Sequence, residues 1–316
     1  MQPAASSAPG AAASSPHFAD RLAEIVARRE SQVVLGLDPD PARLWPKALQ
    51  NAPADGSPAE RAARAVVAHC RALIDAAGPA CCAAKPQLAC FERLGAPGWA
   101  ALAEVVEHAR AAGLIVLADG KRGDIAVSAA AYGQALVGST PTPFGPVAGL
   151  GADAFTASPY LGVDTLETLL EAARPARAGV FVLVRTSNPG AADLEDTETA
   201  AGGALWEKVA TIVDSLGAAG EANLTDVGAV VGATAPQHVA RMRDLMPRTV
   251  FLLPGIGAQG GRVEDLAPAF APHRAAGLVT ASRSIAAAHE GTPGADPGAA
   301  ARGEAERLRA AAWALA

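Results

Sequence analysis

The chain has 316 residues, of which 50% are hydrophobic, 18% charged and 4% aromatic. This composition excludes a largely disordered chain and allows a sizeable buried core. The net charge of −6 argues against a surface for nucleic acid or anionic membranes, because both need clustered positive charge. No apolar run approaches the length of about 18 residues that a membrane-spanning helix needs.

The cysteines lack the paired CxxC spacing of a zinc site and are too few for a disulfide scaffold. We expect them to be buried thiols in a protein of the reducing cytoplasm. They are Cys70, Cys81, Cys82 and Cys90.

Lysine is scarce, because only four of the 26 basic residues are lysines. In such an arginine-rich chain, a lysine at the end of an apolar run indicates a task that arginine does not perform. Lys85 and Lys121 stand in that position, whereas Lys47 and Lys208 do not.

The chain begins with a low-complexity segment, residues 1–16, rich in Ala, Ser and Pro. This segment cannot build a core, and it lacks the basic and apolar regions of a secretory signal. We therefore expect a disordered tail followed by one catalytic domain over residues 17–316. No composition shift in the middle of the chain indicates a linker.

Short β-like apolar runs then alternate with longer helical stretches, as in proteins with a parallel sheet covered on both faces. Eight such alternations predict a (β/α)8 barrel, with a doubly wound open sheet as the alternative. The expected strands are Val33–Asp38, Cys81–Lys85, Leu114–Asp119, Ala152–Thr156, Gly179–Val184, Val227–Val231, Val250–Pro254 and Gly277–Ala281. The expected helices are Pro58–Ala77, Gly98–Ala112, Ile125–Val137, Asp164–Ala173, Thr199–Leu216 and Pro236–Leu245.

Charged residues gather where these strands end, which is the end at which both architectures place the active site. Asp38 and Lys85 end the first two strands, and LADGKRGDI, residues 117–125, ends the third. Asp119 and Lys121 are two residues apart and share a face on an extended strand. A lysine held between carboxylates keeps its proton and can deliver it to a developing carbanion.

Simpler interpretations exist for part of this cluster. Asp124 precedes a helical stretch and is also a suitable N-cap. Asp38 precedes Pro39 and is also a suitable turn residue, and Arg122 fits a solvated turn.

Two further loops carry binding chemistry. PGIGAQGG, residues 254–261, follows the seventh strand, and Arg283 follows the eighth, where barrels frequently bind phosphate. RTSNPG, residues 185–190, follows the fifth strand, so Ser187 and Asn188 either hydrogen-bond a planar heterocycle or form the turn before Pro189.

The segment from Asp119 to Ile125 resembles the D-x-K-x-x-D-I signature of the orotidine 5'-phosphate decarboxylase family. LGLDPD around Asp38, AAKPQLACFE around Lys85, RTSNPG, PGIGAQGG and ASRSI resemble the longer bacterial type of this family, type 2, in order from about residue 31 to 290. This chain has Gly120 where alanine is frequent and Ser128 where threonine is usual. The Gly- and Pro-rich segment 137–150 replaces a simple turn.

The resemblance implies decarboxylation of orotidine 5'-monophosphate to UMP in pyrimidine biosynthesis, without metal or organic cofactor. It implies that Lys121 donates the proton to C6 and that Asp119 faces the departing carboxylate. It further implies a cytoplasmic homodimer in which Asp124 serves the partner's site. The other implied catalytic residue is Lys85, and the implied substrate-binding residues are Asp38, Ile125, Ser128, Ser187, Gly257, Gln259, Gly260 and Arg283.

Two alternatives stay open from the sequence. A Mg2+-dependent sugar-phosphate decarboxylase or synthase on the same scaffold would need an acidic metal ligand at the end of the second strand, where this chain has Lys85. A non-catalytic nucleotide-binding barrel would keep the glycine loop and Arg283 but would not need the charged cluster.

Overall fold

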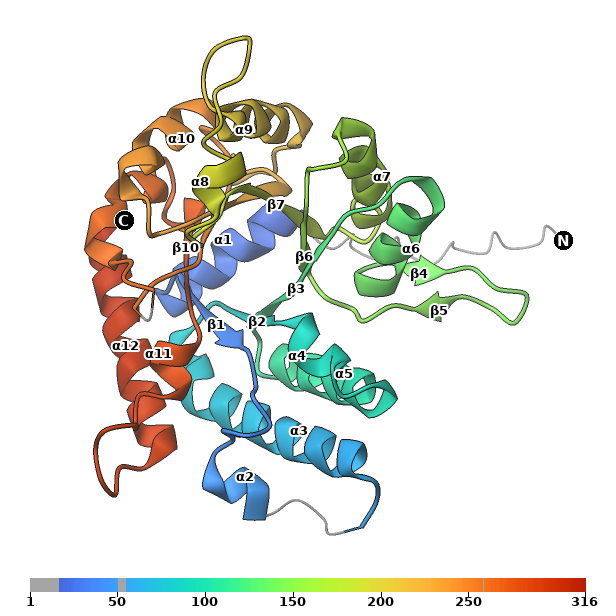
Figure 1. Ribbon diagram of the computed structural model, residues 1–316, viewed down its shortest axis with the longest axis vertical. Helices are drawn as coiled ribbons and strands as arrows, with labels where there is room; N and C mark the ends of the chain where they lie inside the picture. Colours follow the sequence, from blue (N-terminus) through green and yellow to red (C-terminus); the bar gives the residue numbers. More distant parts are fainter. Residues whose placement is uncertain (1–16, 51–54, 258) are drawn as a thin grey trace, which may run out of the picture.

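The computed structural model describes residues 17–50, 55–257 and 259–316. Eight parallel strands close into a barrel in the order β1-β10-β9-β8-β7-β6-β3-β2 (Figure 1). This confirms the predicted (β/α)8 barrel and excludes the open sheet. The barrel strands are β1 (Val33–Leu37), β2 (Ala83–Pro86), β3 (Ile115–Arg122), β6 (Ala154–Ala157), β7 (Gly179–Arg185), β8 (Val227–Val231), β9 (Phe251–Leu253) and β10 (Gly277–Ala281). The expected tail, residues 1–16, lies outside the described residues.

Helices follow the strands and surround the barrel (Figure 1). The α-helices are α1 (Phe18–Arg29), α2 (Pro46–Gln50), α3 (Pro58–Ala77), α4 (Leu88–Glu92), α5 (Ala96–Ala111), α6 (Ala126–Leu136), α7 (Val163–Ala173), α8 (Ala191–Leu194), α9 (Leu205–Leu216), α10 (Val239–Leu245), α11 (Arg283–Ala286) and α12 (Pro297–Leu315). Short 3-10 turns cover Gly78–Ala80, Pro236–His238, Val263–Phe270 and Arg274–Ala276.

The ends of the predicted helices are right in some places and wrong in others. Helix α3 has the predicted bounds because Ser57 and Glu60 form a reciprocal capping box and Pro58 occupies the first turn. Helix α9 begins at Leu205 instead of Thr199. Gly202 and Gly203 adopt φ values of 84° and 77°, which a right-handed helix does not allow.

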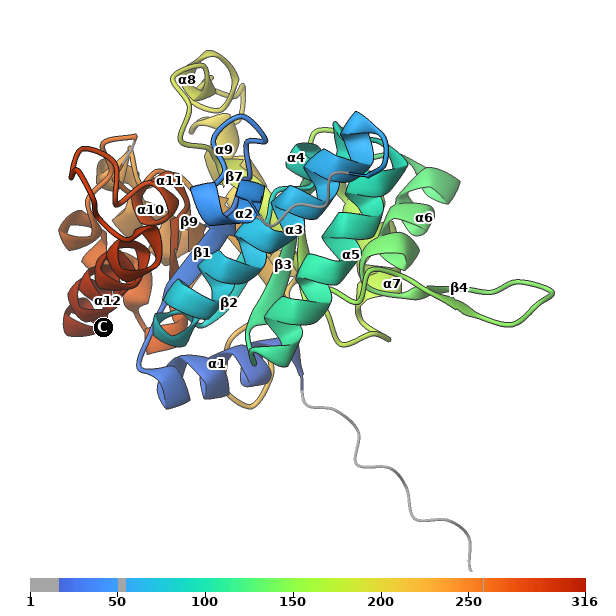
Figure 2. The same cartoon turned by 90° about the horizontal axis from the view of Figure 1, so that it is seen from below.

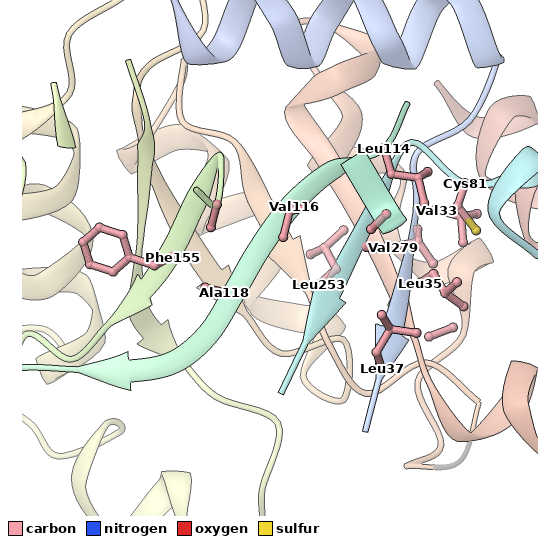
Figure 3. Packing of buried hydrophobic residues seen from close by; sticks show 14 of the residues in the cluster. Val33, Leu35, Leu37, Cys81, Leu114, Val116, Ala118, Phe155, Leu253 and Val279 are labelled. Carbon is pink, nitrogen blue, oxygen red and sulfur yellow. The ribbon is translucent and has the colours of Figure 1, made fainter. Parts of the chain in front are cut away.

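The strands alternate their side chains between two apolar regions. Val33, Leu35 and Leu37 of β1 face the surrounding helices together with side chains of neighbouring strands (Figure 3). Val34 of β1 instead faces the barrel interior, in a second cluster that includes Leu252. Both faces are therefore buried, which explains why the strands read as continuous apolar runs.

Helix α1 fills the end of the barrel opposite the charged residues, and the sequence pattern did not predict it. Figure 2 shows α1 at one end of the molecule and α8 at the other. Phe18 and Leu22 are buried in the interior cluster. The Phe18 ring packs edge-on against Phe181, with centroids 6.0 Å apart, so ligand access lies at the carboxyl ends of the strands.

The Gly- and Pro-rich segment 137–150 forms an antiparallel hairpin of β4 (Ser139–Thr140) and β5 (Val147–Ala148). Both views show it projecting away from the barrel (Figures 1 and 2). In the part of the chain that the structure describes, no helix is long and apolar enough to cross a membrane.

The cysteines are free thiols, and Cys70, Cys81 and Cys82 are buried as expected. Cys90 is only partly buried. Burial raises the pKa of Cys82 to about 12, so this thiol remains protonated at neutral pH.

Candidate active site

A single buried carboxylate organises the charged residues at the mouth of the barrel. Asp119 Oδ2 accepts a hydrogen bond from Lys85 Nζ at 2.6 Å, and Asp119 Oδ1 accepts one from Lys121 Nζ at 2.7 Å. The side chains of Lys85 and Asp119 are 8% and 7% exposed, whereas that of Lys121 is 44% exposed. The three residues therefore form a buried ion pair with a second, accessible ammonium beside it.

The mutual attraction of these groups fixes their charge states. Burial alone would raise the pKa of Asp119, but the Lys85 and Lys121 ammonium groups hold it well below its usual range. Burial alone would lower the pKa of Lys85, but Asp119 and Asp38 raise it above its usual value. Asp119 is therefore a carboxylate and Lys85 an ammonium at neutral pH.

The Lys121 side chain contacts Asp119 although the Lys121 backbone departs from regular strand geometry. Its backbone adopts a left-handed φ of 47°, and the register between β3 and β6 shifts between Ala118 and Arg122. Its backbone N–H donates to Thr156 Oγ1 at 2.9 Å. The predicted contact of Lys121 with Asp119 is confirmed, and a bulge in β3 produces it.

The charged cluster forms one wall of a cavity of about 510 Å3. Leu183, Val230 and Leu252 form an apolar patch in the same cavity. A ligand that has both charged and apolar parts matches this mixture of charged and apolar walls. The predicted residues among the lining are Asp38, Lys85, Asp119, Lys121, Ser187, Gln259 and Arg283.

The loop after β7 places Ser187 and Asn188 in the cavity wall. Gly232 lies directly beneath this loop, where a Cβ atom would come within 2.8 Å of the Ser187 backbone. Asn188 Oδ1 accepts a hydrogen bond from Thr186 Oγ1 at 2.7 Å, so Asn188 also stabilises the turn. Arg185 holds the returning chain through two hydrogen bonds to the Asp196 carboxylate, at 3.0 and 2.9 Å.

The backbone N–H groups of a glycine-rich loop can approach an anion closely, but those of the loop after β9 are used within the loop itself. The N–H groups of Gly257, Gly260 and Gly261 donate to carbonyl oxygens of the same loop, at 3.0, 2.9 and 3.0 Å. These three groups are therefore not free to bind an anion in this conformation. Gly257 and Gly260 serve the loop through positive φ values of 72° and 89°. The side chains of Gln259 and Arg283 line the cavity and remain the candidate anion ligands.

Five predicted residues do not line this cavity, namely Gly257 and Gly260 of the loop described above, and Asp124, Ile125 and Ser128. Asp124 Oδ1 accepts a hydrogen bond from the adjacent Ile125 N–H at 2.8 Å, and Ile125 is 60% exposed. Ser128 is exposed on the first turn of α6. Asp124 is half-buried and does not line the cavity within one chain, so the expectation that it lies together with Asp119 and Lys121 stays a prediction.

The structure adds residues that sequence reasoning missed. Gln87 Nε2 donates to Asp119 Oδ2 at 3.3 Å, and Thr156 Oγ1 donates to Asp119 Oδ1 at 2.9 Å. Thr280 lines the cavity as well. Thr156 and Thr280 stand near the carboxyl ends of short apolar strands, and Gln87 stands two residues after Lys85. These positions are the sequence signal by which the three residues could have been found.

The described residues contain no group of three or more His, Cys, Asp or Glu side chains arranged to hold a metal ion. The end of β2, where an acidic metal ligand would stand in the alternative interpretation, carries Lys85, which is paired with Asp119. An ammonium at that position opposes a divalent cation, since magnesium takes oxygen ligands.

Fold and site together define a (β/α)8 barrel with a lysine–carboxylate centre at the carboxyl ends of its strands. The sequence profile of the orotidine 5'-phosphate decarboxylase / HUMPS family matches residues 31–297. The chain therefore belongs to this family.

Named relatives agree with this assignment. The chain is 40% identical over 275 residues to an orotidine 5'-phosphate decarboxylase of Rhodopirellula baltica, covering 86% of this chain and 89% of that protein. It is 41% identical over 277 residues to that of Haloarcula marismortui, covering 87% and 88%. The solved structure of Leishmania donovani OMP decarboxylase superposes with a TM-score of 0.68 at 34% identity, covering 94% of this chain and 98% of that one.

Proposed function

We propose that this protein decarboxylates orotidine 5'-monophosphate to UMP, the last step of de novo UMP synthesis. The observation that carries the proposal is the Lys85–Asp119–Lys121 cluster, in which one buried carboxylate binds two ammonium groups and only Lys121 is accessible. The named relatives are orotidine 5'-phosphate decarboxylases that match most of this chain.

The cavity offers a separate chemical environment to each part of this substrate. We assign the pyrimidine carboxylate to Asp119 and Lys121, and one edge of the ring to Ser187. Lys85 and Asp38 would hold the ribose hydroxyl groups, and the side chains of Gln259 and Arg283 the phosphate. This assignment is the one that the family resemblance implies, and the residues named in it all line the cavity.

The reaction breaks the bond between C6 and the carboxylate, and the electron pair of that bond stays on C6 as CO2 departs. The Lys121 ammonium then gives a proton to C6, which forms UMP, and the resulting amine regains a proton from water. Asp119 is ionised because its pKa is held low by the two lysines. It therefore accepts the Lys121 hydrogen bond throughout and places a negative charge near the group that loses its charge.

Electrostatic preorganisation supplies the main contribution in this proposal. Enzymes lower barriers by about 8–23 kcal/mol, and fixed charges contribute most in a water-poor site, where no reorganisation is needed. The buried Lys85–Asp119 pair holds that arrangement before substrate arrives. Contacts to the distant phosphate add binding energy that can be used to order the site.

We further propose that the protein acts as a homodimer in which Asp124, Ile125 and Ser128 complete the partner's site. In a single chain these residues do not line the cavity, and Ile125 and Ser128 are exposed whereas Asp124 is half-buried. Mixing Lys121→Ala and Asp124→Ala chains tests this directly. If the site is shared, random pairing restores about a quarter of wild-type activity, since half of the dimers are mixed and each has one intact site. If each chain has its own complete site, the mixture stays inactive.

We also propose that residues 17–316 act as one catalytic domain and that the reaction needs no metal or organic cofactor. Lys85, in place of an acidic ligand, supports the second statement. The cytoplasmic location stays a prediction from the sequence.

The test is a spectrophotometric assay of the purified protein with orotidine 5'-monophosphate in the presence of EDTA. The proposal predicts stoichiometric formation of UMP and CO2. Inactivity with this substrate, together with activity on a sugar phosphate once Mg2+ is added, would contradict it. Binding of UMP without any turnover would instead identify a nucleotide-binding barrel.

A further inference from the structure

We propose that Thr156 is a positioning residue that directs the Lys121 ammonium toward the substrate. The proposal rests on the function assigned to Lys121 above and adds a residue that the sequence motifs do not contain. Thr156 lies on β6, opposite the charged end of β3, and is 1% exposed.

The position of Thr156 follows from the pairing of the two strands. Ala118 pairs with Phe155, and Arg122 pairs with Ala157, so three residues of β3 stand opposite Thr156 alone. Such a bulge re-aims side chains and leaves backbone groups without their regular ladder partners. Here it includes Lys121 in the left-handed conformation, with φ of 47°, which is an unfavourable conformation for a residue with a Cβ atom.

The Thr156 hydroxyl supplies a hydrogen-bond partner for a backbone group in the bulge. It accepts a hydrogen bond from the Lys121 backbone N–H at 2.9 Å, and it donates its own proton to Asp119 Oδ1 at 2.9 Å. Because one hydroxyl group does both, it couples the backbone of Lys121 to the carboxylate. An N–H group that is shielded from water and has no partner is destabilising, so this hydroxyl stabilises the bulged conformation.

The same carboxylate oxygen closes a ring of contacts. Asp119 Oδ1 accepts both the Thr156 hydroxyl and the Lys121 ammonium, which lies 2.7 Å away. Thr156 therefore holds the Lys121 backbone directly and the Lys121 ammonium indirectly, through Asp119 Oδ1. Asp119 Oδ2 is bound separately by Lys85 Nζ and Gln87 Nε2, so loss of Thr156 would leave the Lys85 pair in place and release Lys121 selectively.

The test compares Thr156→Val, which keeps the volume without the hydroxyl, with Thr156→Ser, which keeps the hydroxyl. We expect Thr156→Val to lower kcat about 100-fold with little change in KM, because a catalytic group displaced by about 1 Å costs roughly this factor. We expect Thr156→Ser to stay within about threefold of wild type, since it retains both hydrogen bonds. Thr156→Ala provides a second variant without the hydroxyl should Thr156→Val not fold.

Thr225→Val is the matched control. Thr225 is 1% exposed, and its hydroxyl donates to the Val227 carbonyl at 2.8 Å, at the amino end of β8 and away from the cavity. Its loss lowers the melting temperature without changing kcat. A kcat of Thr156→Val near that of the control would overturn the proposal, as would equal losses in Thr156→Ser and Thr156→Val.

Crystal structures of wild type and the hydroxyl-free variant separate this inference from the function on which it rests. We expect the Lys121 ammonium to leave Asp119 Oδ1 in the variant while Lys85 remains on Oδ2. An unmoved Lys121 would overturn the positioning role even in an active enzyme. Inactivity of the wild type toward orotidine 5'-monophosphate would instead contradict the proposed function. The two crystal structures would then still decide whether Thr156 positions Lys121.

Discussion

Replacing Asp119 by asparagine removes the one carboxylate that neutralises two lysines while keeping the size of the side chain. Lys85 is the residue most affected, since its side chain is 8% exposed and its ammonium lies 2.6 Å from Asp119. Removal of one partner of a buried ion pair costs about 3–5 kcal/mol, because the other charge stays buried without compensation. We expect Asp119→Asn to lose about this free energy of unfolding at pH 7.

The pH dependence of this loss has a definite sign. In the wild type the pKa of Lys85 is raised, so its contribution is complete below the unfolded value of about 10.4 and is lost as pH rises through the folded value. In Asp119→Asn, burial is opposed mainly by Asp38, and we expect the pKa of Lys85 to fall below the unfolded value. The unfolded chain then binds more protons, and stability of the variant rises with pH. The deficit relative to wild type therefore shrinks between pH 7 and 10.

Urea denaturation of wild type, Asp119→Asn, Lys85→Met and the double variant measures these effects. The double variant should lose less stability than the sum of the two single losses, by about 0.5–3 kcal/mol, the usual size of coupling between residues in direct contact. An Asp119→Asn variant as stable as wild type would refute the reasoning. Strict additivity of the two substitutions would refute it as well.

Two further predictions concern other parts of the barrel. Burial, together with the nearby His289, lowers the pKa of His69 from 6.5 to about 4. The unfolded chain therefore binds the proton first, and wild type should lose about 3 kcal/mol of stability as pH falls from 6.5 to 4. His69→Asn keeps an acceptor for the Trp45 backbone N–H and should reduce this loss in urea titrations, whereas an unchanged profile would contradict the assignment. Arg283→Ala should raise KM for orotidine 5'-monophosphate about 10- to 100-fold, as expected for a charged hydrogen bond of about 1.5–3 kcal/mol. It should hardly affect slow turnover of orotidine, which has no phosphate, and an equal loss with both substrates would contradict a role at the phosphate.

The sequence was sufficient for the barrel because hydrophobic burial leaves a direct pattern. Most of the strands are buried along their whole length and read as short apolar runs, for example β8, Val227–Val231. Helix α1 was missed because it precedes the first strand and so is not part of the strand–helix alternation that predicted the barrel. Its buried residues nevertheless fill the barrel interior. The hairpin of β4 and β5 was missed because its strands have two residues each.

The candidate site was predictable only in part. The spacing on an extended strand predicted that Lys121 and Asp119 share a face, but their contact is produced by a bulge. That bulge depends on the register between β3 and β6, which no local pattern encodes. Thr156 is distant in sequence from both residues that it binds. The glycine loop had the right position, yet its N–H groups bond within the loop, because composition does not determine where a turn directs its donors.

Single-turnover decarboxylation of orotidine 5'-monophosphate in D2O, with wild type beside Lys121→Ala, tests the central claim most directly. The account predicts UMP with deuterium at C6 from the wild type. For Lys121→Ala it predicts loss of turnover by several orders of magnitude, with UMP still bound through its phosphate and ribose. A Lys121→Ala enzyme that converts substrate at a near-normal rate would contradict the assignment of Lys121 as the proton donor.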